Sequence, residues 1–427
     1  MRRCIRPTTA RGEITVPGSR SIANRVLVAA ALAEGVSIIR GVPVCDDTEA
    51  MISGLRSLGV TIRREGNELR VTGTGGRIGR PGAIVDAMAS GTTARFLTAV
   101  ACLGGQQAVV DGVKRLRERP LRPLVEALGN AGAHIHGTHL PIVAGGSRLT
   151  GGSLEVDASA SSQFVSALAL IAPVVDGGLS IRWSELVSRP FVEMTVEVMA
   201  IFGVTAELSD RVLVIPAGAA YRAAEMSVPP DAASAVYPAL AAAITGGSVV
   251  IEGLRPAPSQ ADLRVFEVLE QMGCRIVWSE TGVSVDGPER LRSVNVDMGS
   301  APDGALAVAI AAACADGTST IRGLGTLAAK ESDRIAGLAE GLTAIGAVVE
   351  AHTAGLSITS GDSRGATIDP RADHRMAMVF SVAGIANEGV CVEDTNCVSK
   401  TWPDFYEEMG RICGSDWAYP APQESTE

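Results

Sequence analysis

The stretch VPGSRSIANRVLVAAALAEG (residues 16–35) opens with polar residues, continues as an apolar run and ends at glycine. Glycine just beyond the last apolar residue is a common signal for the end of a helix, so the stretch predicts a buried helix. Arg20 and Arg25 stand near its start, although a helix N-terminus already carries partial positive charge. Arginines, serines and unsatisfied backbone N–H groups together predict a binding site for phosphate or carboxylate.

The same polar-to-apolar pattern occurs six times, at intervals of about 70 residues. Its copies start at Ser21, Ser90, Ser161, Ser234, Asp303 and His374. Short β-rich runs, amphipathic helices and alternating hairpins fill most of the intervals, so each unit reads strand–helix–strand–helix–strand–strand. Because the first helix of each unit is apolar on all sides, we expect it to be buried with the second helix packed outside it.

Six such units predict an α/β fold with two similar domains of three units each. Two prolines in EMSVPPDAAS (225–234) mark the expected boundary. We expect residues 14–227 to form one domain, residues 1–13 with 228–413 to form the other, and residues 414–427 to be a flexible tail. Parallel buried helices with N-termini facing the interdomain cleft would create a strong anion site there.

Composition excludes several classes of protein. The 427-residue chain has a formal net charge of −10 and only one short basic cluster, which argues against a nucleic-acid partner. Its apolar runs are shorter than the ~20 residues that span a bilayer, and its N-terminus lacks the apolar core of a secretory signal. Eight cysteines without a CxxC pair predict reduced thiols, no structural disulfide and a cytoplasmic location.

Two polar motifs have simpler interpretations than catalysis. HIHGTH, with His134, His136 and His139, occupies the place of a peripheral hairpin, so a surface strand is favoured over a zinc site. The acidic run DDTEAM (46–51) opens an amphipathic helix, so its Asp and Thr residues are predicted to be helix caps.

Lysine is rare, since only Lys114, Lys330 and Lys400 occur among 37 basic residues. A lysine in so arginine-rich a chain is a candidate for specific chemistry, because the two cations differ in shape and acidity. The motifs AAKESDR (328–334), ADHRMAM (372–378) and SKTWPDF (399–405) carry charged residues at equivalent places of different units. Each motif alone is compatible with a solvated helix end, but together they favour one catalytic region.

At these motifs the chain resembles the enolpyruvyl transferase family over residues 8–410. The resemblance rests on PGSRSIANR, SGTTARF, RERP, SASSQF, SAPDGA, KESDR, DHRMAM and SKTWPDF. It implies a two-domain inside-out α/β barrel of six βαβαββ repeats. It also implies transfer of a carboxyvinyl group from phosphoenolpyruvate to the 5-hydroxyl of shikimate-3-phosphate, with release of phosphate through a tetrahedral intermediate. Neither a metal ion nor another cofactor is implied.

The resemblance assigns roles to residues at matching positions. The residues implied to bind shikimate-3-phosphate are Arg20, Ser21, Arg25, Ser161, Ser162, Gln163, Ser188, Asp303 and Lys330. Those implied to bind phosphoenolpyruvate are Arg20, Gly91, Arg119, Gln163, Arg334, Arg375 and Lys400. Asp303 would take the 5-hydroxyl proton, and Glu331, His374 and Lys400 are candidates for protonating the methylene carbon. Arg20 stands where the family usually has lysine.

Three alternatives remain open at this point. A branch of the family that acts on UDP-N-acetylglucosamine uses a catalytic cysteine in the region where this chain has VKRLRERPLR (113–122), without cysteine. An enzyme of secondary metabolism would use a different alcohol. A non-catalytic paralogue would only bind a phosphorylated metabolite, but binding alone does not require the acid–base residues retained here. We expect a monomer.

Overall fold

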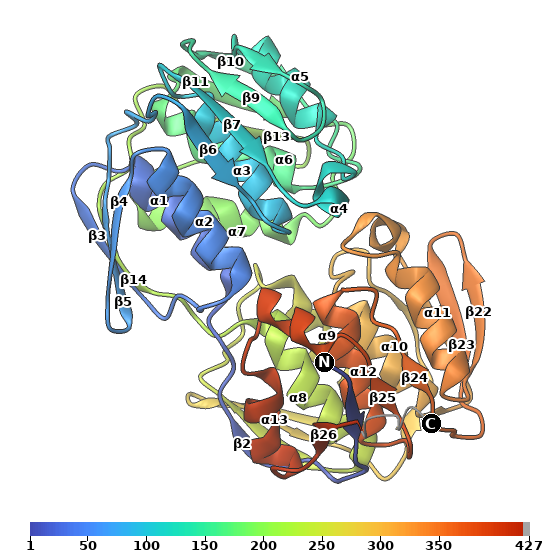
Figure 1. Cartoon of the computed structure of the whole chain (residues 1–427). Coiled ribbons are helices and arrows are strands. Elements are labelled where there is room, and N and C mark those ends of the chain that lie inside the picture. The colour runs from blue at the N-terminus through green and yellow to red at the C-terminus, as the bar shows by residue number, and fades with distance from the viewer. Residues whose placement is uncertain (422–427) are drawn as a thin grey trace, which may run out of the picture. The chain divides into compact units, whose positions relative to one another are not determined.

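The computed structural model describes residues 1–421, and the chain divides into two compact units. The first unit is Gly18–Pro229, and the second unit combines Met1–Pro17 with the chain from Pro230 onward (Figure 1). Both units are mixed α/β structures, and each is described by itself below.

Three buried helices form the centre of the first unit and contact one another (Figure 1). They are α1 (Arg20–Leu32), α3 (Gly91–Ala101) and α6 (Gln163–Ile171). Abundant alanine and valine let their backbones approach closely, and Ser90 caps α3 by accepting a hydrogen bond from the Thr93 N–H. More exposed helices pack outside them: α2 (Asp46–Ser57), the short α4 (Lys114–Arg117), α5 (Arg122–Asn130) and α7 (Pro190–Ile201).

Three four-stranded sheets surround these helices, and all have the same pattern of one parallel and two antiparallel pairings. The first contains β14 (Glu225–Ser227), β3 (Val36–Arg40), β5 (Glu68–Thr72) and β4 (Thr61–Glu65). The second contains β6 (Ala83–Asp86), β7 (Gln107–Asp111), β9 (Ile142–Gly145) and β8 (Ile135–His136). The third contains β10 (Thr150–Glu155), β11 (Asp176–Arg182), β13 (Val212–Ile215) and β12 (Glu207–Leu208).

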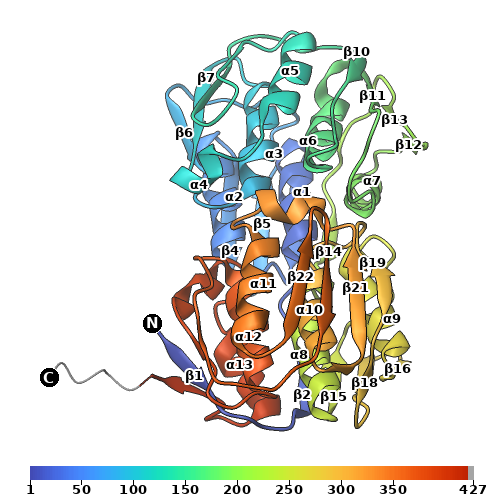
Figure 2. The same ribbon diagram turned by 90° about the vertical axis from the view of Figure 1, so that its right-hand side faces the viewer.

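The second unit also has three buried central helices in mutual contact (Figure 2). They are α8 (Ala232–Thr245), α10 (Ala305–Ala313) and α12 (His374–Gly384), with α9 (Arg264–Gln271), α11 (Arg334–Ala344) and α13 (Phe405–Cys413) outside them. Apolar as the central helices are, no helix within residues 1–421 has the length and apolar character to cross a membrane.

Two sheets of the second unit repeat the same pairing pattern. One contains β2 (Arg11–Ile14), β15 (Ser248–Glu252), β17 (Gly282–Asp286) and β16 (Arg275–Trp278). The other contains β19 (Asn295–Asp297), β21 (Thr318–Arg322), β23 (Gly355–Thr359) and β22 (Val348–His352). A short parallel pair joins β18 (Leu291–Arg292) to β20 (Ala315–Asp316).

The remaining four-stranded sheet is completed by segments from far apart in the chain (Figure 1). Its order is β24 (Thr367–Ile368), β25 (Cys391–Val392), β1 (Arg3–Ile5) and β26 (Ala418–Pro420). The expected flexible tail from residue 414 is therefore wrong for residues 414–421, because β26 pairs with β1 along its length. Residues 422–427 lie outside the described part of the chain.

A disulfide joins β1 to β25. Cys4 and Cys391 are direct partners across the two antiparallel strands, and their sulfurs are bonded. The expectation of reduced thiols without a structural disulfide is therefore wrong for this pair. Cysteine spacing gave no sign of it, since the two residues are 387 positions apart and meet only through strand pairing. The other six cysteines are free thiols.

Candidate active site

Helix starts of the first unit that carry family motifs lie within hydrogen-bonding distance of one another. The Gln163 side chain, at the start of α6, donates to Thr92 Oγ1 on α3 over 3.2 Å. Arg95 Nη1 donates to Gln163 Oε1 over 2.6 Å, and Arg95 Nη2 donates to the carbonyl of Pro120 over 3.3 Å. Ser162, which precedes α6, is buried beside them. The SGTTARF, RERP and SASSQF segments thus meet at the N-terminal ends of α3 and α6, where backbone dipoles favour an anion.

Arg25 is a buried cation held by neutral acceptors. Its Nε donates to Thr195 Oγ1 over 2.8 Å, its Nη1 to the Ser21 carbonyl over 2.8 Å, and its Nη2 to the Phe191 carbonyl over 3.0 Å. Burial lowers the pKa of Arg25 to about 9, which still leaves it charged at neutral pH. Within residues 1–421 no carboxylate pairs with Arg25, so an anionic ligand would supply the missing counter-charge.

Arg20 makes a partly buried ion pair that the sequence did not predict. Its Nη1 lies 2.7 Å from Asp47 Oδ2 on α2. Thr48 contributes to capping α2, as expected, because its side chain completes a capping box with Cys45. Asp47, predicted only as part of that cap, instead holds the guanidinium of Arg20. An acidic residue in the first turn of a helix looks the same in the sequence whether it caps the helix or pairs with a distant cation. The sequence therefore could not separate the two roles of Asp47.

Arg334 is the centre of the cluster in the second unit. It is 1% exposed and donates to three carboxylates. Its Nε lies 2.7 Å from Asp373 Oδ2, its Nη1 2.9 Å from Asp303 Oδ1, and its Nη2 2.9 Å from Glu331 Oε2. Burial alone lowers the pKa of Arg334, but these carboxylates outweigh it and raise the pKa above its ordinary value.

Asp303 lies just before α10 and faces three cations. Lys330 Nζ is 3.3 Å from its Oδ1, and Arg375 Nη2 is 3.5 Å from its Oδ2. Burial raises the pKa of Asp303, yet the charges of Lys330, Arg375 and Arg334 prevail and hold the pKa well below the usual range. An anionic substrate near these cations would push this pKa upward. Without substrate, the cations keep the carboxylate ionised.

Lys400 completes this cluster from a short 3₁₀ helix, η4 (Thr395–Lys400). Its Nζ lies 3.1 Å from Glu331 Oε1, and the residue is only 8% exposed. His374, the first residue of α12, is buried with its Nδ1 3.6 Å from Asp373 Oδ1. Asp303, Glu331 and Lys400 are therefore linked directly or through Arg334 in one network of the second unit, and His374 lies beside Asp373, another member of that network.

Asp373 has no role implied by the resemblance, although it organises this network. It is fully buried, caps α12 by accepting the Arg375 N–H over 3.0 Å, and binds Arg334 through both of its oxygens. The sequence placed Asp373 at a helix start, which is a sufficient reason for an aspartate there. Its contact with Arg334, on α11, leaves no local signal in the sequence.

Breaking the Arg334 network should be costly to stability. We expect Arg334→Met to lower the free energy of unfolding by about 3–5 kcal/mol, because Asp373 would remain buried without its cation. Arg264→Met is the matched control, since it removes only the exposed pair with Glu267 and should cost under ~1 kcal/mol. Urea unfolding of both variants tests this. Equal losses would show that the buried network adds no stability of its own.

Strained backbone precedes the helices that carry these residues. Non-glycine residues with positive φ within residues 1–421 are Met88, Ser188, Arg371, Ala372 and Asp394, with φ between 41° and 57°. Met88 lies just before α3, Ser188 before α7, Arg371 and Ala372 before α12, and Asp394 before η4. Such conformations cost energy and are concentrated at functional sites, where surrounding contacts enforce them. Ser188 is the one that the resemblance also implies to bind substrate.

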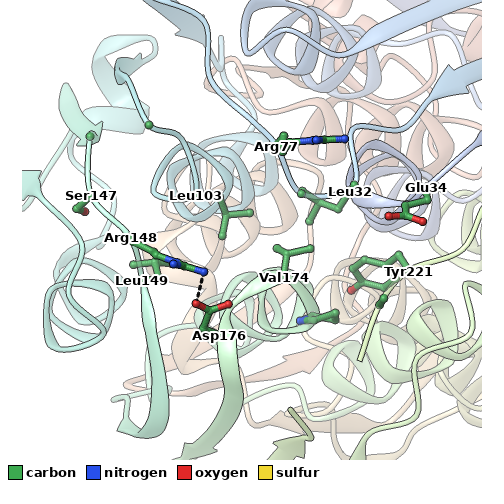
Figure 3. A pocket seen from close by; sticks show the side chains of 16 residues that line it. Leu32, Glu34, Arg77, Leu103, Ser147, Arg148, Leu149, Val174, Asp176 and Tyr221 are labelled. Atoms are coloured by element: carbon green, nitrogen blue, oxygen red, sulfur yellow. Dashed lines mark ion pairs between the residues drawn. The ribbon is translucent and has the colours of Figure 1, made fainter. Parts of the chain in front are cut away.

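A cavity of about 670 Å³ lies elsewhere in the first unit. Leu32, Leu103 and Val174 line it from the C-terminal ends of the central helices, and an Arg148–Asp176 ion pair lies at its edge (Figure 3). None of the residues that the sequence implicates lines this cavity. This cavity therefore does not coincide with the network described above.

Comparison with known proteins places the chain in one family. The family model described as EPSP synthase (3-phosphoshikimate 1-carboxyvinyltransferase) matches residues 6–409. A protein from Ralstonia nicotianae named 3-phosphoshikimate 1-carboxyvinyltransferase is 38% identical over 424 residues, covering 94% of this chain and 97% of the relative. The chloroplastic enzyme of that name from Brassica napus is also 38% identical, over 94% of this chain and 83% of the relative.

Solved structures agree with this assignment. EPSP synthase from Acinetobacter baumannii superposes with a TM-score of 0.82 at 27% identity, covering 96% of this chain and 98% of that one. The enolpyruvyl transferase NikO from Streptomyces tendae, at 19% identity, has a TM-score of 0.78 over 99% of both chains and shares the fold. The chain therefore belongs to the EPSP synthase (3-phosphoshikimate 1-carboxyvinyltransferase) family.

Proposed function

We propose that the two side-chain clusters bind and process the substrates of a 3-phosphoshikimate 1-carboxyvinyltransferase. As a member of this family the chain is a transferase of aromatic amino-acid biosynthesis, and it moves the carboxyvinyl group of phosphoenolpyruvate to the 5-hydroxyl of shikimate-3-phosphate. The observation that carries the assignment of roles is the linkage of Asp303, Glu331 and Lys400 through Arg334. Binding alone does not require this set of acids and bases.

We assign shikimate-3-phosphate mainly to the first unit. Arg25 supplies a buried positive charge with no carboxylate partner within residues 1–421, and the starts of α1 and α6 supply backbone N–H groups. The proposed contacts in this unit are Arg20, Ser21, Arg25, Ser161, Ser162, Gln163 and Ser188. From the second unit, Asp303 and Lys330 would contact the same substrate, with the Asp303 carboxylate at its 5-hydroxyl.

We assign phosphoenolpyruvate mainly to arginines and to Lys400, as the resemblance implies. The proposed contacts are Arg20, Gly91, Arg119, Gln163, Arg334, Arg375 and Lys400. Arginine suits this role because its planar fork binds carboxylate and phosphate through two parallel hydrogen bonds. Arg334 and Arg375 already face carboxylates, so the anionic substrate would share these cations with Asp303. The cations would then lower the pKa of Asp303 less than they do in the free protein.

The reaction then follows from proton transfers in the second unit. Asp303 accepts the 5-hydroxyl proton while the oxygen bonds to C2 of phosphoenolpyruvate, and Lys400, Glu331 or His374 protonates C3 to form a methyl group. The tetrahedral intermediate next loses phosphate as its C2–O bond breaks, and Asp303 returns its proton to the leaving phosphate. The group that protonated C3 takes a proton back from the methyl group, which restores the double bond. Lys400 and Glu331 are 3.1 Å apart and can pass the proton between them.

Gly91 tests the phosphoenolpyruvate assignment. A Cβ at this position would lie 2.9 Å from Arg119 Nη1 and 3.0 Å from Arg95 Nη1, so Gly91→Ala must displace both guanidinium groups. We expect the KM for phosphoenolpyruvate to rise about tenfold or more while the KM for shikimate-3-phosphate changes little. Gly129→Ala is the control, because no atom lies within 4 Å of its added Cβ. Parallel increases in both KM values would contradict the assignment.

We also propose the finer architecture that the sequence predicted. The recurrent four-stranded sheets and central helix triplets support six βαβαββ repeats in a two-domain inside-out barrel. The expected domains were residues 14–227 and residues 1–13 with 228–413. We propose that they correspond to the two compact units, Gly18–Pro229 and Met1–Pro17 with the chain from Pro230, and that β26 belongs to the second. We propose that the protein is a monomer, because a single chain supplies both clusters. We also propose a cytoplasmic location. Sedimentation analysis with and without substrates tests the oligomeric state, and a stable dimer would contradict it.

The function is tested by mixing pure protein with phosphoenolpyruvate and an acceptor substrate and measuring the phosphate released. We expect phosphate release with shikimate-3-phosphate and none when UDP-N-acetylglucosamine replaces it. Release with UDP-N-acetylglucosamine alone would favour the other branch of the family, and release with neither would favour a non-catalytic protein.

A further inference from the structure

Met1, two residues before strand β1, contacts the segment that carries Lys400. It lies between β25 and β26, and the chain runs from β25 through Asp394 into η4. The carbonyl of Met1 accepts two hydrogen bonds from Thr395, the first residue of η4: one from its N–H over 2.9 Å and one from its Oγ1 over 3.0 Å. Residues at opposite ends of the chain therefore meet at the start of the helix that ends with Lys400.

The disulfide fixes this contact in register. Cys4 and Cys391 are paired directly across β1 and β25, so the covalent bond joins β1 to the strand that leads into η4. The adjacent pair, Arg3 and Val392, continues the same register toward Met1 and Thr395. Sliding or separation of β1 would move the Met1 carbonyl away from η4.

η4 depends on such external support. It is a 3₁₀ helix of six residues, and Asp394 before it has φ 41°. Short 3₁₀ segments have poor hydrogen-bond geometry, and a non-glycine residue at positive φ persists only where its surroundings enforce it. Thr395 is 2% exposed, so water would not readily replace the Met1 carbonyl as its partner while the fold is intact.

We propose that β1, held by the Cys4–Cys391 disulfide, positions Lys400 for proton transfer, and that reducing this bond lowers turnover. Cys4, Cys391 and Thr395 are positioning residues that act through η4. The inference rests on the proposed role of Lys400, whose Nζ must stay at Glu331 in the network with Arg334. Small displacements of a reacting group are enough to reduce turnover strongly.

The redox step is an ordinary thiol–disulfide exchange. A dithiol reductant attacks one sulfur of the bond, the Sγ–Sγ bond breaks, and the dithiol closes into its own disulfide. Two electrons and two protons pass from the reductant to Cys4 and Cys391, which become thiols. Reoxidation by a disulfide of the same class reverses the exchange.

The test compares oxidised and dithiothreitol-reduced full-length protein, with thiols counted by mass spectrometry. We expect reduction to lower kcat roughly five- to fiftyfold while the KM for shikimate-3-phosphate and its binding stoichiometry stay unchanged. General unfolding would instead lower the stoichiometry. Amide hydrogen exchange should become faster at Thr395–Lys400 after reduction and stay unchanged in α1.

Variants separate the effect of losing the disulfide on kcat from other effects of the reductant. Cys4→Ser should match the reduced protein and should not respond to dithiothreitol, whereas Cys314→Ser, which alters a free thiol in the same unit, should respond like the parent. Thr395→Val should lower kcat with the disulfide intact. Unchanged kcat in fully reduced protein, or cysteines already reduced in the protein as isolated from air-oxidised solution, would overturn the proposal. Phosphate release in either redox state would leave the proposed function standing.

Discussion

Asp303→Ala is expected to lower kcat by about 10²–10⁴-fold while binding of shikimate-3-phosphate stays nearly intact. The variant removes the carboxylate that would take the 5-hydroxyl proton, but it leaves Lys330, Arg334 and Arg375 to attract the anionic substrates. Steady-state kinetics and calorimetric binding measure the two effects separately. Asp316→Ala, which removes an exposed carboxylate of the same unit, should leave kcat within about a factor of two.

If Asp303→Ala retained half of the wild-type kcat, Asp303 would not be the base of the reaction. Loss of binding together with turnover would instead indicate that Asp303 organises the cluster and does not act on the hydroxyl. The low pKa of Asp303 in the free protein means that its carboxylate is ionised but weakly basic. The anionic substrates must therefore raise this pKa before Asp303 takes the hydroxyl proton.

Lys400→Arg should be almost inactive, with kcat lowered by about 10²–10³-fold, whereas Arg20→Lys should remain active. Lys400 is 8% exposed and pairs with Glu331, so it is placed to give up a proton, which a guanidinium does not do at neutral pH. Arg20 pairs with Asp47 at 2.7 Å and would contribute charge and hydrogen bonds, which lysine also supplies. Arg20→Ala should therefore lose ~2–4 kcal/mol of transition-state stabilisation.

The three variants form one comparison of kcat and kcat/KM. Wild-type turnover in Lys400→Arg would show that position 400 needs only positive charge. Inactivity of Arg20→Lys would show that the guanidinium shape is essential at position 20, and the proposed division between the two cations would be wrong.

The central helices were predictable because their signals are local. Apolar runs beginning at Ser21, Ser90 and His374 correspond to α1, α3 and α12, whose observed starts are Arg20, Gly91 and His374. Each run is too apolar to remain on a surface, and glycine or a loop ends it. Repetition at one spacing then made the α/β class predictable before any contact was known.

Contacts between distant segments were not predictable in the same way. β1 and β26 are short strands from the two ends of the chain, and their pairing, like the Cys4–Cys391 disulfide, depends on the completed second unit. Asp47 and Asp373 both occur at helix starts, where capping already explains an acidic residue. Only the structure shows their second contacts, to Arg20 and Arg334.

Isotope exchange tests the central claim, that the chain adds a proton to C3 of phosphoenolpyruvate and later removes one. The protein is incubated in D₂O with phosphoenolpyruvate and shikimate-3-phosphate, and the product is analysed by mass spectrometry and NMR. Rotation of the transient methyl group should place deuterium in the methylene group of the product and, through reversal, in recovered phosphoenolpyruvate. Full turnover with no deuterium in either methylene group would contradict an addition–elimination mechanism at this site.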